Sequence, residues 1–136
     1  MQHIRNIVRI AATEASNLSA ILYPAPGICH IPANVEFTPI GCKSPSSLEI
    51  TDKMESKVRI FTAKLSFKSA DDLADGGKPL AYMVTTAMGE RYLIGGYQRP
   101  YPVITRSEVM PSSLTDTSLI AYSVSWQGVV KPLRVV

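Results

Sequence analysis

The chain has 136 residues and a formal net charge of +3, and 46% of its residues are hydrophobic while 18% are charged. This length suits one domain, because a single core usually serves about 100–200 residues, and the hydrophobic fraction excludes a disordered chain. The 14 Lys and Arg residues are dispersed rather than gathered in a run, so nucleic acid is not an expected partner.

The N-terminal end alternates apolar residues with arginines. Residues 4–10 favour a strand with Val8 and Ile10 on one face. Residues 11–22 mix Ala and Leu with Thr, Ser and Asn, which weakens a helical pattern, so we expect a short helix or a loop there. The N-terminus lacks the continuous apolar region of a signal peptide, and no stretch reaches the ~18 apolar residues of a membrane span. We therefore expect neither export nor membrane insertion.

The segment from Tyr23 to Pro45 holds five of the ten prolines. Proline cannot donate a hydrogen bond to a sheet, so this segment cannot be central strand throughout. We predict that residues 1–47 form an irregular, proline-rich extended arm with short strands at 27–31 and 35–38.

Residues 48–136 are dominated by the alternation typical of strands with one buried face. The strand predicted over residues 58–67 places on its apolar side Phe61, Ala63, Leu65 and Phe67. The strand predicted over residues 118–126 places on one side Ile120, Tyr122, Val124 and Trp126.

In the sequence between these two strands, a β-hairpin is predicted. Its strands are residues 80–86 and 91–94, and its turn is at Met88-Gly89. Residues 129–136 offer a last, proline-interrupted edge strand. The fold class that we predict is all-β, a single domain (1–136) built as an antiparallel β-sandwich or small barrel of about seven strands, with the arm at 1–47 and the β core at 48–136.

No pattern of catalytic or metal-binding residues emerges from the sequence. Cys29 and Cys42 match no metal-binding spacing, and His30 beside Cys29 is isolated, so two reduced thiols are expected rather than a metal site. Asp71, Asp72 and Asp75 lack the spacing of a calcium loop and favour a solvated turn. We expect no enzyme, no catalytic residue, no cofactor and no metal.

The segment that is most informative about function is the Arg-Pro-Tyr-Pro element at residues 99–102, which comes after the two glycines that follow residues 91–94. Its two prolines favour extended backbone around Tyr101 and lower the entropy lost when this aromatic residue is ordered. Such a tyrosine suits a protein–protein contact, but it equally suits a plug at the end of the sandwich. Our candidate contact residues are Tyr97, Arg99, Pro100, Tyr101 and Pro102.

The run from Lys78 to Pro102 resembles small proteins from the structural gene clusters of tailed bacteriophages and prophages of Bacteroidetes, crAss-like phages included. The matching features are Arg-Tyr-Leu-Ile-Gly at 91–95, Arg-Pro-Tyr-Pro at 99–102 and a last strand that ends in Ser125-Trp126. The resemblance covers about residues 57–130, and residues 1–47 do not contribute to it.

This resemblance implies a non-enzymatic structural protein of the virion: a neck, ring or tail subunit that forms a homo-oligomer. Its expected neighbours are portal, neck or tail proteins, and its expected place is the virion, after assembly in the host cytoplasm. The alternative function, from a different class of protein, is that of a cellular β-rich module that binds a carbohydrate or a nucleic acid.

Overall fold

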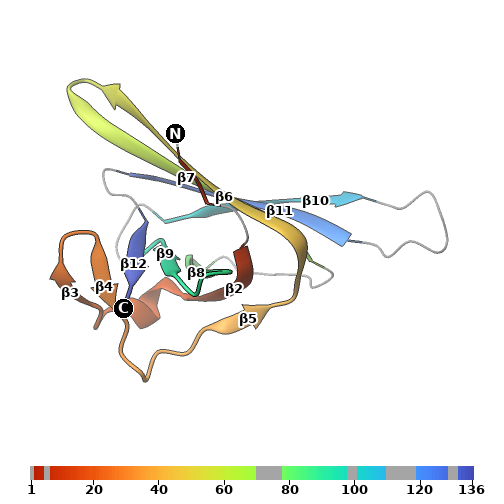
Figure 1. Ribbon diagram of the computed structural model, residues 1–136, viewed down its shortest axis with the longest axis horizontal. Coiled ribbons are helices and arrows are strands. Elements are labelled where there is room, and N and C mark those ends of the chain that lie inside the picture. The colour runs from red at the N-terminus through yellow and green to blue at the C-terminus, as the bar shows by residue number, and fades with distance from the viewer. Residues whose placement is uncertain (1, 5–6, 70–77, 98–100, 110–118, 129–131) are drawn as a thin grey trace.

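The computed structural model describes residues 2–4, 7–69, 78–97, 101–109, 119–128 and 132–136. Within these residues the chain forms twelve strands and one short 3-10 helix, η1 (Ala15–Leu18), which confirms the predicted all-β fold. The strands make two sheets that lie one above the other (Figure 1). The number of strands exceeds the expected seven. Several of the twelve are short strands of only three or four residues.

The first sheet has five strands in the order β1-β6-β7-β11-β10, each antiparallel to its neighbours. Its strands are β1 (Gln2–Ile4), β6 (Cys42–Glu55), β7 (Val58–Ser69), β11 (Leu119–Gly128) and β10 (Val103–Val109).

The second sheet has seven strands in the order β3-β4-β12-β9-β8-β2-β5. Its strands are β3 (Leu22–Ala25), β4 (Ile28–His30), β12 (Leu133–Val135), β9 (Arg91–Ile94), β8 (Leu80–Thr86), β2 (Ile7–Glu14) and β5 (Thr38–Ile40). Strands β12 and β4 are parallel and the other neighbouring pairs are antiparallel, so this sheet is mixed rather than purely antiparallel as expected.

The main hydrophobic core lies between the two sheets. Its buried side chains include Ala63, Leu65 and Phe67 from β7, Tyr122 and Val124 from β11, and Tyr82, Val84 and Ile94 from the facing sheet. The predicted alternation of β7 and β11 is therefore confirmed, because the residues of one parity point into this core and those of the other parity point outward.

A second core covers the other face of the seven-stranded sheet. Leu18 and Ile21 pack there with Cys29, Ala81 and Leu93. Strands β8 and β9 are therefore buried on both faces, and the N-terminal third provides the second cover. This corrects the expectation of an arm at 1–47, since β2 lies between β8 and β5 inside the sheet and η1 packs on it.

Two expectations for strand faces and edges are wrong. Val8 is 58% exposed while Ile10 is 1% exposed, because the pairing of β2 with β8 shifts register between Ile7 and Arg9 and so turns Val8 to the other face. Strand β12 lies between β4 and β9 rather than at an edge.

Three prolines lie within strands of the described chain, at positions where a missing N–H group costs little. Pro24 lies in β3 and Pro39 in β5, which are the two edge strands of the larger sheet. Pro45 lies in β6 where its pairing with β7 shifts register between Lys43 and Ser47. This irregularity lets β6 run for 14 residues as the longest strand of the described chain, although its proline did not suggest a strand.

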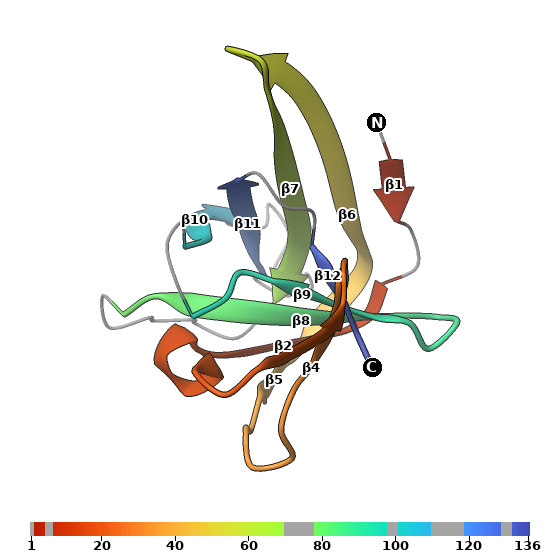
Figure 2. The same ribbon diagram turned by 90° about the vertical axis from the view of Figure 1, so that its left-hand side faces the viewer.

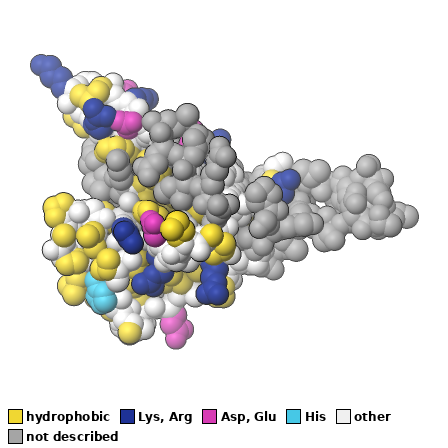
Figure 3. All heavy atoms as spheres, viewed as in Figure 1, with side chains coloured by type: hydrophobic (Ala, Val, Ile, Leu, Met, Phe, Trp, Pro, Cys, Tyr) yellow, Lys and Arg dark blue, Asp and Glu magenta, His cyan; other side chains and the backbone are white. Residues whose placement is uncertain are grey.

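Strands β6 and β7 form a hairpin that projects beyond the rest of the molecule (Figures 1 and 2). Within the described residues, β11 pairs with β7 only as far as Phe61, so from Lys53 to Ile60 the two strands pair with each other alone. We call residues 52–59 the hairpin tip. Figure 3 shows hydrophobic and charged side chains together on it. In the described parts of the chain, no helix has the length and apolar character to cross a membrane.

Candidate protein contact site

The structure brings two of the candidate contact residues, Tyr97 and Tyr101, to one open hollow of about 700 Å³. The rest of its lining comes from two distant segments: Glu14, Ala15 and Ser16, and Lys78 and Pro79. We call this hollow the tyrosine groove. It joins the end of β2, the start of β8 and the segment after β9, three places far apart in the sequence.

The tyrosine side of the groove is built by a turn at the end of β9. Gly95 adopts a φ of 102°, a left-handed conformation that side chains other than glycine rarely accept, and so redirects the chain. The Tyr101 hydroxyl donates a hydrogen bond of 3.2 Å to the Tyr97 carbonyl, which links the two ends of this segment. Tyr97 is 47% exposed and Tyr101 is half-buried. Both tyrosines therefore present aromatic surface to the groove.

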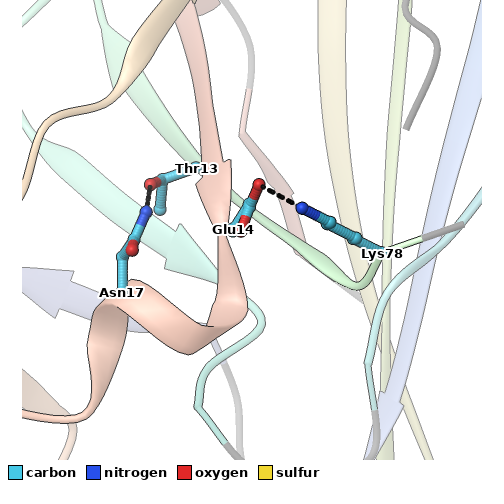
Figure 4. Close-up of polar contacts among 4 residues, drawn as sticks. All are labelled: Thr13, Glu14, Asn17 and Lys78. Carbon is cyan, nitrogen blue, oxygen red and sulfur yellow. Dashed lines mark hydrogen bonds and ion pairs between the residues drawn. The ribbon is translucent and has the colours of Figure 1, made fainter. Parts of the chain in front are cut away.

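The opposite side is held by contacts between β2 and the start of β8. The Ala15 N–H group donates to the Pro79 carbonyl at 3.0 Å, and Lys78 Nζ lies 3.5 Å from Glu14 Oε1 (Figure 4). Asn17 Nδ2 donates to Thr13 Oγ1 at 3.0 Å and links η1 to β2. The Glu14–Lys78 pair is solvent-exposed, so it adds little stability and remains able to exchange partners.

Pro102 lies beside the groove rather than in it. Its ring packs against Gly95 and lines a smaller hollow of about 300 Å³ that shares Lys78 and Pro79 with the tyrosine groove. Arg99 and Pro100, the other two candidates, lie outside the described residues. The contact role of all five stays a prediction. Tyr101 is half-buried and lines an open hollow, so the contact and the plug both stay open for it.

Sequence reasoning missed Glu14 and Lys78 as members of this site. The two residues are 64 positions apart, and each is a single charge near a strand end with no motif around it. Only the pairing of β2 with β8, which places Glu14 opposite Leu80, brings them together.

The described residues offer little for catalysis or metal binding. No three His, Cys, Asp or Glu side chains among them are close enough to hold a metal ion. Cys29 is a buried free thiol, and burial raises its pKa above the ordinary value of 9.0 more than the charge of Arg91 lowers it. The side chain of Cys42 and the residues Asp71, Asp72 and Asp75 are outside what the structure describes.

Tyr92, in β9, has its hydroxyl bound to a carboxylate. It donates to Glu90 Oε2 at 2.7 Å, and this hydrogen bond is the main reason why the pKa of Tyr92 is raised above 10.0. A raised pKa makes the phenol a weaker acid and keeps it neutral, so this contact is structural rather than an activated group.

These features define the described part of the chain as a two-sheet, all-β protein whose candidate site is an open hollow lined by two tyrosines. No family model, no curated protein and no solved structure matches the chain.

Proposed function

We propose that the protein is a non-enzymatic structural subunit of a tailed-bacteriophage virion, a component of its neck, ring or tail, and that copies of it form a homo-oligomeric ring. The observation that carries this proposal is the tyrosine groove, where Tyr97 and Tyr101 present aromatic surface beside the exchangeable Glu14–Lys78 pair. Tyrosine is enriched at the energetic centres of protein interfaces, because its ring gives a large contact area at a low cost in entropy.

The hairpin tip supplies a matching surface on the other side of the contact. Met54 is 60% exposed and Val58 is 47% exposed there. Lys53 is paired with Glu55, and Arg59 with Asp52. A flexible thioether packs well against aromatic rings. In the proposed ring the tip of one copy enters the tyrosine groove of the next, and its charged pairs lie near Glu14 and Lys78.

A contact of this kind joins two different surfaces of the same chain. Such a heterologous contact makes a closed ring when its rotation closes, and each copy then uses one tip and one groove. The two open faces of the ring are left for portal, neck or tail proteins, and the assembled particle is the place where the protein acts.

The test is the mass of the purified protein by light scattering after size-exclusion chromatography. The wild-type chain is expected to be a ring. Met54→Ser with Val58→Ser, which alters the tip, and Tyr97→Ala with Tyr101→Ala, which alters the groove, are each expected to give monomers. Met88→Ser and Tyr23→Ala are the matched controls, because these side chains are exposed but belong to neither surface; both are expected to keep the ring.

Mixing the two monomeric variants tests the heterologous geometry. Groove-altered copies keep an intact tip and tip-altered copies keep an intact groove, so the mixture is expected to form dimers that cannot grow further. A wild-type monomer at high concentration would overturn the ring, and variants that keep the wild-type mass would overturn these contact surfaces.

A further inference from the structure

The outer face of the five-stranded sheet gathers positive charges that are dispersed in the sequence. On β7, Leu65 points into the core, so its neighbours Lys64 and Ser66 and then Lys68 point outward. Lys64 and Lys68 are exposed, and neither is part of an ion pair within the described residues.

A row of hydroxyl groups crosses this face beside the lysines. The strand register places Ser66 between Ser47 on β6 and Ser123 on β11, and Ser123 lies opposite Thr105 on β10. Strands are about 4.8 Å apart, so the row spans about 14 Å. The Thr105 hydroxyl donates to the Ser123 carbonyl at 3.3 Å, which fixes its position at one end of the row.

These side chains line a single shallow hollow of about 360 Å³, which we call the hydroxyl–lysine hollow. The cationic side chains that face it are those of Lys64 and Lys68, because Arg106 lies opposite Tyr122 in the register and so points to the core side of β10. No carboxylate is part of the lining that the structure describes. Glu49 lies opposite Lys64 in the register but outside the hollow, at its rim. The outer face of the sheet at this hollow thus combines two cations, Lys64 and Lys68, with five hydroxyl groups, those of the row and that of Ser107.

We propose that the hydroxyl–lysine hollow binds the phosphate groups of a nucleic-acid backbone. Phosphate oxygens accept hydrogen bonds from serine and threonine hydroxyls, and lysine and arginine neutralise their charge. The aromatic lining residues, Phe67 and Tyr122, are buried with their rings on the core side. They cannot stack on bases, so the backbone is held without regard to base sequence.

The experiment is fluorescence anisotropy of labelled single-stranded and double-stranded DNA titrated with the whole chain over a range of salt concentrations. Lys64→Gln with Lys68→Gln is expected to weaken binding about tenfold at low salt and to reduce the slope of log K against log salt by about 2, since each phosphate contact contributes about 0.9. Arg9→Gln with Arg134→Gln removes the same charge from exposed positions of the seven-stranded sheet, outside the hollow, the tip and the groove, and is expected to leave both quantities nearly unchanged.

Glu49→Gln is expected to change the affinity in the opposite direction. It removes a negative charge beside Lys64 and is expected to strengthen binding a few-fold. Equal affinity for oligonucleotides of different base composition is expected as well. The proposal is overturned if the Lys64/Lys68 variant and the Arg9/Arg134 variant weaken binding equally, if Glu49→Gln weakens it, or if inorganic polyphosphate binds while DNA does not. The same titration with the monomeric tip variant separates this proposal from that of the ring, because the hollow lies within one copy.

Discussion

Gly95 and Pro102 lie in direct contact across the segment that carries both tyrosines. A Cβ atom added to Gly95 would lie 2.8 Å from Pro102 Cγ and 3.3 Å from the Cβ of Ala81, in addition to the strain of its positive φ. The ring of Pro102 therefore occupies space that only a glycine leaves free. This contact brings the chain back to the sheet after Tyr97, so that Tyr97 and Tyr101 line the same groove.

Gly95→Ala is expected to destabilise the protein by about 1–3 kcal/mol, because the substitution adds both steric overlap and backbone strain. Thermal or urea unfolding measures the loss. Gly96→Ala is the matched control: it has no atom within 4 Å of the added Cβ and no positive φ, and it is expected to change stability little. Similar losses for the two variants would contradict the contact described here.

The turn of the projecting hairpin is built from residues that are not suited to it. Ser56 and Lys57 have φ values of 50° and 66°, the left-handed conformation for which Asn-Gly is the preferred pair. Ser56→Asn with Lys57→Gly is expected to stabilise the hairpin by about 1 kcal/mol, because the strain of the left-handed conformation is relieved. A higher melting temperature checks this. Ser56→Ala with Lys57→Ala is the control, and stabilisation by this pair as well would contradict the explanation.

The stacked rings of Phe67 and Tyr122 support the five-stranded sheet from the core side. Their centroids are 5.2 Å apart, and the two residues are direct neighbours on β7 and β11. Phe67→Ala is expected to cost about 3–5 kcal/mol in the free energy of unfolding. Phe61→Ala, on the same face of β7 but half-buried near the hairpin tip, is expected to cost clearly less. Urea denaturation compares them, and equal costs would contradict the burial described.

Stability is expected to fall at alkaline pH. The pKa values of Cys29 and Tyr92 are both raised in the folded protein, above 9.0 and 10.0 respectively. The unfolded chain therefore loses these protons first, so their contribution is complete below about pH 9 and is lost as the pH rises through the folded values. Melting temperatures from pH 8 to 11 measure the decline. It should be shallower in Cys29→Ala with Tyr92→Phe, and an unchanged slope would show that other groups cause it.

Much of the strand pattern could be predicted from the sequence. Strand β8 was expected at the residues where it lies, 80–86, and β9 at 91–94. The prediction of which side chains of β7 and β11 point into the core was also correct, because a buried and an exposed face demand different residues at alternate positions. Strand β6 was missed because its proline sits at a register shift, which local propensity cannot show.

The candidate site was predictable only in part. The proline-framed segment drew attention to Tyr97 and Tyr101, whereas Glu14 and Lys78 reach the groove through the pairing of β2 with β8. In the same way, Lys64 and Lys68 are ordinary charges on one strand until β10 and β11 place several hydroxyl groups next to them.

The sequence by itself determined the all-β class and which face of most strands is buried, because alternating polarity acts between neighbouring residues. Only the tertiary structure decided which strands are neighbours, that the N-terminal third covers a second core, and which distant side chains share a hollow. Those outcomes depend on long-range pairing and packing, whose energies are spread over the whole chain.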